Sequence, residues 1–302
     1  MKSRTDTDHP VFSPALADYL ALLKFRLLSL VLVSTCMGFF ISADAQTPLL
    51  PLIFTLLGIT LVGGGANCLN QWIERDADSR MLRTRLRPLP TLRLTASNAL
   101  LFGLLISLCG FVLIGWQVNQ LTLWLSFVSW SSYLLIYTPL KSRSPLNTWV
   151  GAVPGAIPAI LGCTAAVNTL TADTLALFLI LYVWQMPHFF AISWVYRDDY
   201  LRGGFRMLSW NDESGRRTAI HILLHTVLLV PISAGLYLAG SSGLFYLAST
   251  ILSSLVFLHY ALQFYRDPSK AAAKKVFHYS IVWLPLLFAT IMLDRLLRSI
   301  AF

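Results

Sequence analysis

The chain has 302 residues, of which 56% are apolar and only 12% charged, with a mean hydropathy of +0.65. A soluble globular domain is about a quarter charged, so this composition excludes an ordinary soluble protein and predicts an all-α integral membrane bundle. The net charge of +9 would suggest nucleic acid in a soluble protein. Here the charges lie in short loops between apolar runs, so we expect a membrane topology signal and no nucleic-acid partner.

Residues 1–24 are predicted to form a cytoplasmic N-terminal segment, followed by a single transmembrane domain over 25–302. The segment is polar for too long, and too acidic with Asp6, Asp8 and Asp18, to be a cleavable signal or a transit peptide. The four cysteines lie in apolar runs without CxxC spacing. We therefore expect small buried or lipid-facing residues at Cys36, Cys68, Cys109 and Cys163, with no disulfide framework or thiolate metal site.

Nine apolar stretches are long enough to span a bilayer, which takes about 20 helical residues. They are predicted near 25–43, 49–69, 96–118, 121–138, 147–166, 174–195, 219–239, 243–265 and 277–297. If the chain crosses nine times, 21 of the 23 basic residues fall on one side, and only Arg295 and Arg298 fall on the other. Short loops rich in Lys and Arg stay in the cytoplasm, so this distribution predicts a cytoplasmic N-terminus and supports the count of nine.

The segment after the second span carries the richest set of polar residues. Asn70, Glu74 and Asp78 recur every four residues, so each step turns only about 40° around a helix and the three share one face. Stacked oxygen ligands suit Mg²⁺, which commonly shares its coordination with substrate phosphates. Arg83, Arg85 and Arg87 follow, and guanidinium groups bind phosphate oxygens. The pattern predicts a metal and diphosphate site; the alternative is a solvated loop in which acids only pair with arginines.

Two further segments carry charge beside apolar helices. A predicted loop after the sixth span holds Arg197, Asp198 and Asp199, which either contribute a metal ligand and a diphosphate anchor or simply fill a charged loop. Lys141 and Arg143 follow the fourth span and either close over the anion or act only as topology signals.

One histidine lies within a predicted span. His188 follows Met186 and Pro187, and a histidine inside a membrane is a candidate functional residue, although a packing role is the alternative. The stretch Gly63–Gly65 precedes the first motif and allows either another helix or a ligand to approach closely.

Four strings resemble one family. NCLNQWIERDADSRMLRTRLRP is similar to the first aspartate-rich motif of the UbiA-type intramembrane prenyltransferases, and Asn70, Glu74 and Asp78 occupy its Asn-x-x-x-Asp-x-x-x-Asp positions. SPLNTWVGAVPGAIPAILG, WQMPHFFAISWVYRDDYLRGGFRML and DESGRRTA resemble, more narrowly, the protoheme IX farnesyltransferase branch, also called heme O synthases. The sequence departs from the family at Phe25, where the family often has proline, and at Arg206, where it commonly has proline again. The second motif of the wider family aligns on Tyr196 and Tyr200 rather than on aspartates.

The resemblance implies a nine-helix fold and an enzyme that converts heme B and farnesyl diphosphate to heme O and diphosphate. Mg²⁺ is then held by Asn70, Glu74, Asp78 and Asp198, with Asp199 as a further catalytic residue. Substrate binding is predicted at Arg83, Arg87, Lys141, Arg143, Tyr137, His188 and Arg197. His188 is predicted to ligate or orient the heme iron, and Tyr137, Tyr196 or Trp72 to face the allylic cation. The resemblance further implies the bacterial inner membrane, a site facing the cytoplasm, and assembly with a heme A synthase or a terminal oxidase.

Three rival functions stay open from the sequence, and one of them, a binding or assembly protein without catalysis, leaves the shared face of Asn70, Glu74 and Asp78 unexplained. A prenyltransferase acting on a quinone precursor would keep the first motif but not the other strings. A membrane transporter would normally carry its charges near the bilayer midplane, whereas these acids stop at the cytoplasmic helix ends.

Overall fold

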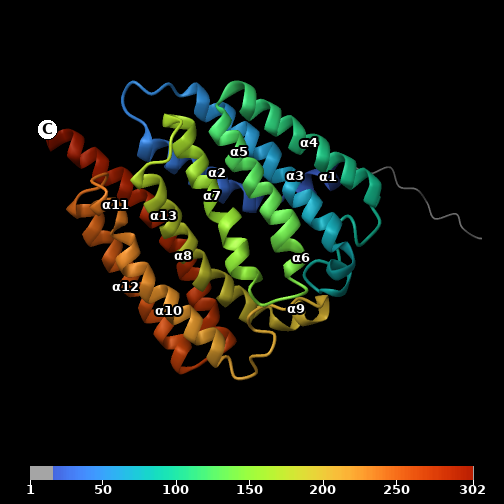
Figure 1. The fold of residues 1–302 in the computed structure, drawn as a ribbon. Helices are drawn as coiled ribbons and strands as arrows, with labels where there is room; N and C mark the ends of the chain where they lie inside the picture. Colours follow the sequence, from blue (N-terminus) through green and yellow to red (C-terminus); the bar gives the residue numbers. More distant parts are fainter. Residues whose placement is uncertain (1–15, 302) are drawn as a thin grey trace, which may run out of the picture.

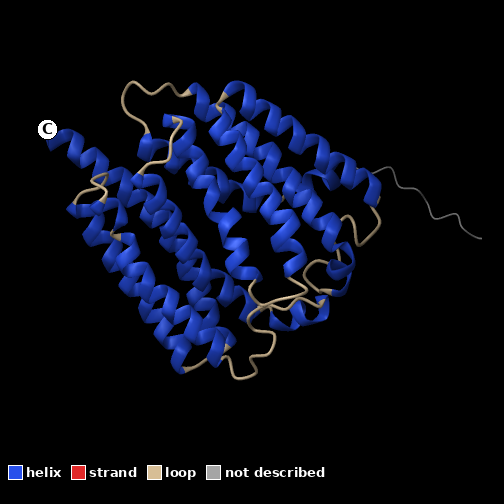
Figure 2. Cartoon of the chain, in the orientation of Figure 1, coloured by secondary structure: helices blue, strands red, loops and turns tan. Residues whose placement is uncertain are grey.

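The computed structural model describes residues 16–301, which form a bundle of helices joined by loops and contain no strand (Figure 2). In chain order the elements are α1 (Leu16–Leu23), α2 (Phe25–Ser42), α3 (Leu50–Arg80), α4 (Ala96–Gln117), α5 (Gln120–Ser131), the π-helix η1 (Ser132–Tyr137), α6 (Thr138–Leu140), α7 (Asn147–Val167), α8 (Ala172–Val195), α9 (Arg197–Gly203), α10 (Arg216–Ser233), α11 (Gly235–Leu238), α12 (Leu244–Arg266) and α13 (Lys270–Ala301).

Eight stretches of the described chain are long and apolar enough to cross a membrane as helices. They are α2, α3, α4, α7, α8, α10 continued by α11, α12 and α13. The fourth predicted span, 121–138, is instead divided among α5, η1 and α6, which follow one another without a break. Pro139 lacks an N–H group and disturbs helical hydrogen bonding here, and the preceding turns widen into a π-helix. With this segment, the described chain crosses the bundle nine times; eight of the crossings are helices long and apolar enough to span a membrane, and the ninth is interrupted at η1.

The bundle is organised around α8, which packs against α7, α10 and α13, while α3 pairs with α4 and α2 pairs with α7 (Figure 1). The α2–α7 crossing is close because glycines lie at the contact. A Cβ atom at Gly38 would collide with the Ala159 carbonyl, and one at Gly162 with the Thr35 carbonyl. Close approach through small residues is typical of helix packing in membranes. Gly65 has the same role against Gly103 of α4, which favours the packing interpretation of the Gly63–Gly65 stretch.

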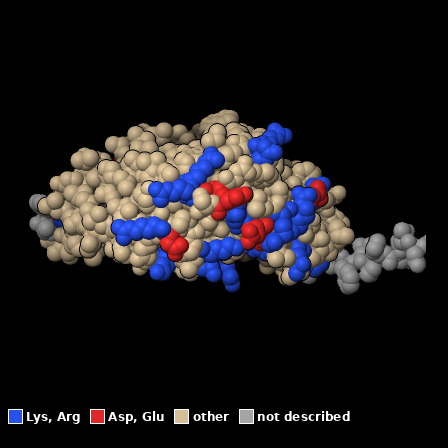
Figure 3. Space-filling model, turned by 90° about the horizontal axis from the view of Figure 1, so that it is seen from below, with Lys and Arg blue, Asp and Glu red and all other residues tan. Residues whose placement is uncertain are grey.

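Helix α3 continues eleven residues beyond the predicted end of its apolar stretch at residue 69. Its last three turns therefore project from the apolar part of the bundle and carry the first motif. The loop of residues 81–95 follows, and α9 lies at the same end of the molecule (Figure 1). Seen from this end, lysines and arginines surround a smaller number of acids (Figure 3). The end of the bundle that carries most of the positive charge is therefore the end that carries the motif.

The predicted N-terminal segment is only partly described, because residues 1–15 lie outside the described range. Its remaining part is α1, which packs on α3 through Leu22 and Cys68, and on α4 through an edge-on contact between the rings of Tyr19 and Phe102. A break at Lys24, whose backbone is left-handed with φ of 53°, separates α1 from α2. The chain therefore turns sharply just before its first span.

Candidate functional site

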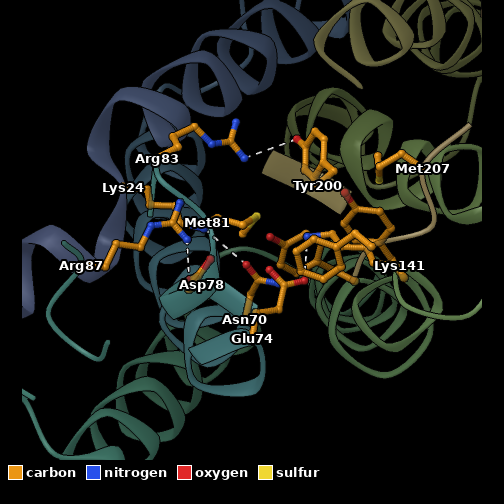
Figure 4. Close-up of a pocket in the computed structure, with 13 residues that line it drawn as sticks. Lys24, Asn70, Glu74, Asp78, Met81, Arg83, Arg87, Lys141, Tyr200 and Met207 are labelled. Atoms are coloured by element: carbon orange, nitrogen blue, oxygen red, sulfur yellow. Dashed lines mark hydrogen bonds and ion pairs between the residues drawn. The ribbon is translucent and has the colours of Figure 1, made fainter. Parts of the chain in front are cut away.

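A cavity of about 120 Å³ lies at the charged end of the bundle, between the last turns of α3, the helical break around η1 and the loops beside α9. Figure 4 shows most of its side chains pointing toward one another. The lining consists of four cations, three oxygen-bearing residues of α3, three tyrosines and three apolar residues. They are Lys24, Arg83, Arg87, Lys141, Asn70, Glu74, Asp78, Tyr133, Tyr137, Tyr200, Met81, Phe205 and Met207.

The two carboxylates of the first motif are buried in this cavity. Glu74 Oε1 lies 2.8 Å from Lys141 Nζ, and Asp78 Oδ2 lies 2.7 Å from Arg87 Nη1. The second oxygen of Asp78, Oδ1, is also buried and accepts no hydrogen bond from the described residues. A buried carboxylate oxygen without a donor is costly. Asp78 Oδ1 is therefore available to bind a cation or a hydrogen-bond donor that enters the cavity.

Asn70 is held by a chain of hydrogen bonds that begins in the π-helix. Its Nδ2 donates to Thr138 Oγ1 over 3.1 Å, and Thr138 Oγ1 donates to the Tyr133 carbonyl over 2.8 Å. The Asn70 amide nitrogen is thereby occupied, and its Oδ1 faces Lys24 Nζ at 3.3 Å. The helical break thus fixes which end of the Asn70 amide is presented to the cavity.

The cations differ in how strongly they are paired. Burial lowers the pKa of Lys24 to about 7, and the nearby charges of Arg87 and Lys141 add to the effect. Burial acts in the same direction on Lys141, but Glu74 and the neighbouring tyrosines outweigh it and raise its pKa. The Lys141 ammonium lies 4.7 Å from the centre of the Tyr137 ring. The cavity holds more cations than carboxylates, so it favours an anionic guest.

Asp199 joins the two charged segments instead of lining the cavity. Its carboxylate accepts hydrogen bonds from Leu82 N at 3.0 Å and Arg83 N at 3.2 Å, and it pairs with Arg202 at 2.5 Å. Burial alone would raise the pKa of Asp199, but Arg202 and the two backbone N–H groups outweigh it, and the pKa falls. Arg83, held in this way, stacks on the rings of Tyr196 and Tyr200. The predicted catalytic residue Asp199 thus positions the loop that carries Arg83.

Several other predicted site residues lie outside the cavity. Asp198 is exposed and pairs with Lys270 at 2.7 Å, which lowers its pKa. Arg197 donates to the Ser209 carbonyl, and Arg143 is exposed. His188 lies between α8 and α13, with its Nδ1 2.7 Å from Ser280 Oγ.

The sixth span is followed by a short helix, so the expectation of a loop there is wrong. This helix, α9, turns Asp198 outward and Asp199 toward residues 82–83. Of the aromatic residues considered for the allylic cation, only Tyr137 lines the cavity, because Tyr196 stacks on Arg83 and Trp72 on Arg75.

The sequence interpretation missed part of the lining. Lys24 belongs to no motif in the sequence, yet it lies at the break between two helices, where its side chain turns into the cavity. Tyr133 precedes Tyr137 by four residues, a spacing that would have placed both on one helical face. Met81, Phe205 and Met207 pack together as a small apolar cluster under the loops, which no local pattern predicts.

The donor set fits a hard cation that is completed by a substrate. Asn70, Glu74 and Asp78 offer only oxygen atoms, which Mg²⁺ prefers. Among the described residues no three Asp, Glu, His or Cys side chains come together as a closed metal cage. Mg²⁺ is usually bound by one or two carboxylates together with substrate phosphates, so such an open set is the expected arrangement.

Comparison with known proteins defines the class. Residues 31–289 match the model of the UbiA prenyltransferase family, and the chain belongs to this family. Its fold is similar to a solved digeranylgeranylglyceryl phosphate synthase, with a TM-score of 0.78 at 17% identity over 92% of this chain and 98% of that one. It is also similar to a UbiA homolog from Archaeoglobus fulgidus bound to GPP and Mg²⁺, with a TM-score of 0.61 at 15% identity over 91% and 99%.

Within the UbiA family, the chain is clearly similar in sequence to protoheme IX farnesyltransferases. The protoheme IX farnesyltransferase of Solibacter usitatus (strain Ellin6076) is 39% identical over 92% of this chain and 98% of its own length. That of Koribacter versatilis (strain Ellin345) is 38% identical over 95% and 96%. The chain is therefore a multi-pass membrane prenyltransferase. The family membership that its four sequence strings predicted is confirmed. The transporter alternative is thereby excluded.

Proposed function

We propose that the chain transfers the farnesyl group of farnesyl diphosphate to a vinyl group of heme B, forming heme O and releasing diphosphate. The observation that carries the proposal is the buried face of Asn70, Glu74 and Asp78, which meets four cations in one cavity of a chain this similar to protoheme IX farnesyltransferases. That similarity also favours heme B over the quinone-precursor alternative.

The cavity's cations are suited to the leaving group. Charge builds up on the diphosphate as the allylic C–O bond breaks, and preplaced positive groups in a water-poor site stabilise that charge. Arg83 and Lys24 are free to turn to phosphate oxygens without losing a carboxylate partner within the described residues. Arg87 and Lys141 exchange part of their pairing with Asp78 and Glu74 for the incoming anion.

The oxygen face of α3 would hold Mg²⁺ on the diphosphate. The unpaired Asp78 Oδ1, the Glu74 carboxylate and the oriented Asn70 Oδ1 supply the ligands. A bound Mg²⁺ neutralises phosphate charge and orients the leaving group. Asp198 lies outside this set because it is exposed beside Lys270, and we assign it no part in the mechanism.

Of the three tyrosines that line the cavity, Tyr133 and Tyr137 lie four residues apart in the π-helix η1. The faces of Tyr133 and Tyr137 would stabilise positive charge through their ring electrons. The heme vinyl π electrons then form the new C–C bond, water adds to the resulting benzylic-type cation, and the water releases a proton. The products are the hydroxyethylfarnesyl side chain and diphosphate.

His188 remains our candidate for holding the heme iron. The Ser280 hydroxyl donates its proton to the Phe277 carbonyl over 2.6 Å, so toward His188 the Ser280 oxygen can only accept. His188 therefore carries its proton on Nδ1, and Nε2 is the basic nitrogen. A ligating histidine commonly donates its other ring N–H in this way. A His188→Ala variant that bound and converted heme normally would rule the role out.

We further infer a bacterial inner membrane location with the cavity facing the cytoplasm, because the end of the bundle that carries it also holds most of the lysines and arginines. A heme A synthase or a terminal oxidase would take up the product as an assembly partner.

The test is product formation. Membranes holding the protein are incubated with heme B, farnesyl diphosphate and Mg²⁺, and heme O is identified by its mass. We expect product with the wild-type chain and with Asp76→Ala, an exposed acid on the same helix. Asp78→Ala should lose activity by about 10²-fold or more, as removal of a transition-state contact does. Undiminished product from Asp78→Ala, or conversion of an aromatic quinone precursor in place of heme B, would contradict the proposal.

A further inference from the structure

Helix α1 and residues 81–95 form one packed unit at the side of the bundle, which we call the α1–loop unit. Leu22 of α1 is buried against Leu89 and Leu94 of the loop. Asp18 of α1 pairs with Arg93 of the loop at 3.1 Å. The two segments, some 70 residues apart in sequence, are therefore joined both by apolar packing and by an ion pair.

The position of this unit along α3 is fixed by hydrogen bonds. Asn67 Nδ2 donates to the Leu23 carbonyl over 3.1 Å, and Gln71 Nε2 donates to the Leu22 carbonyl over 2.8 Å. These two residues flank position 69, where the apolar stretch of α3 ends. Cys68 Sγ contacts the Ala99 carbonyl at 3.1 Å, so the first turn of α4 lies at the same level. The α1–loop unit therefore lies at the level of the lipid headgroups.

The unit exposes leucines where a cytoplasmic loop would normally be polar. Leu92 is 85% exposed, Leu86 is 73% exposed and Leu20 is 43% exposed. None of the three lies in a membrane-spanning helix. Leu92 also has a left-handed backbone with φ of 58°, which is unfavourable for a residue with a Cβ atom and persists only where the surroundings hold it. The three exposed leucines, rather than the backbone of Leu92, are what make the α1–loop unit apolar outside the membrane-spanning helices.

Arginines accompany these leucines. Arg85 is exposed, and the side chain of Arg93 is half exposed while its Nη2 donates to the Leu86 carbonyl. Apolar side chains beside arginines, at headgroup level, match the two chemical layers of a bilayer surface, which are acyl chains and phosphate groups.

We propose that the α1–loop unit is a membrane-surface anchor, in which Leu20, Leu86 and Leu92 insert into the inner leaflet while Arg85 and Arg93 contact anionic lipid phosphates. Because the same loop carries Arg83 and Arg87 into the cavity, lipid contact would hold the loop that lines the prenyl diphosphate site. The proposal concerns a surface outside that site and does not depend on the reaction.

The bilayer is favoured over a protein partner by the level of the unit. A protein-binding loop would extend away from the membrane, whereas Leu92 lies only four residues before the start of α4, which enters the apolar layer. The charge is also complementary, since Arg85 and Arg93 face the phosphates of an anionic leaflet.

Spin-label depth measurements test this placement. A nitroxide is attached at Leu92→Cys or Leu86→Cys in a chain with Cys36→Ala and Cys109→Ala, because Cys68 and Cys163 are buried. The full-length protein is placed in phosphatidylcholine bilayers with or without phosphatidylglycerol. Accessibility to oxygen, which concentrates in lipid, is compared with accessibility to a water-soluble nickel chelate. Asp76→Cys on α3 is the matched aqueous control, because the Asp76 side chain is 84% exposed.

We expect labels at 92 and 86 to be more accessible to oxygen than to the nickel chelate, with the reverse at 76. We also expect deeper insertion when phosphatidylglycerol is present, and a smaller difference in Arg85→Gln, a change that leaves the Asp18–Arg93 pair intact. Nickel accessibility at 92 equal to that at 76 in both bilayers would overturn the anchor. Shielding that appears only in native membranes, and not in pure lipid, would also overturn it and indicate a protein partner.

Discussion

At the charged end of the bundle, α3 and α8 lead into segments that look alike in sequence, since each joins an apolar helix to a cluster of acids and arginines. On α3 the helix continues to Arg80, so Glu74 and Asp78 remain in register and are buried in the cavity. After α8 the chain ends one helix at Val195 and begins another at Arg197. This break turns Asp198 toward solvent and Asp199 toward a backbone. The acids therefore line the cavity where the helix continues, whereas after the break one acid is exposed and the other accepts backbone hydrogen bonds from residues 82–83.

The largest effect expected from this comparison is at Glu74. Glu74→Gln keeps the side-chain volume but removes the charge that pairs with Lys141, so we expect heme O formation to fall about 10²–10³-fold, in the range of a lost electrostatic contact. Asp198→Asn is the matched change in the other segment. Its exposed pair with Lys270 is worth about 0–1 kcal/mol, so the rate should change less than about fivefold. Equal losses in the two variants would break the distinction between the segments.

Asp199→Ala should have an intermediate effect. It removes the acceptor of the Leu82 and Arg83 N–H groups, and a lost buried hydrogen-bond partner costs about 1–3 kcal/mol. We expect the KM for farnesyl diphosphate to rise about tenfold, since 1.4 kcal/mol is a factor of ten, with a smaller change in kcat. Amide exchange at Leu82 and Arg83 should accelerate. A fall in kcat with unchanged exchange would mean that Asp199 acts on the substrate directly.

Thr138→Val should have a smaller effect because it acts through Asn70. The hydroxyl that accepts from Asn70 Nδ2 is lost while the shape is kept, and a net hydrogen bond is worth about 0.5–1.5 kcal/mol. We expect a higher Mg²⁺ concentration for half-maximal activity, by about three- to tenfold, and recovery in Thr138→Ser. An unchanged Mg²⁺ dependence in Thr138→Val would show that the amide needs no such support.

The smallest effect concerns pH. The pKa of Asp199 in the folded chain lies below that of an unfolded aspartate, about 3.9. Its contribution to stability is therefore complete above that value and is lost as the pH falls through the folded pKa. Exchange protection of Leu82 and Arg83 should persist at mildly acidic pH in the wild-type chain and be lost in strong acid. In Asp199→Asn this pH dependence should disappear; its persistence would assign it to another group.

Much of the architecture followed from local pattern. Runs of apolar residues located the eight uninterrupted spans of the described chain, because a bilayer imposes length and composition on every span independently, but they did not reveal that the segment 121–138 is divided among α5, η1 and α6. The i, i+4, i+8 spacing located the oxygen face of α3 because helical geometry is local. The family strings of the chain gave the prenyltransferase class.

The rest was decided by tertiary contacts. Lys24 reaches the cavity only because its left-handed backbone breaks the helix there and packs α1 on α3. The separation of Asp198 from Asp199 depends on a helix break and on a loop more than 100 residues earlier. The amide orientation of Asn70 depends on a π-turn in another helix. Sequence alone determined the spans and the oxygen-bearing face of α3, because both depend on neighbours within a few turns. The structure decided which charges line the cavity, because that depends on residues brought together from different helices.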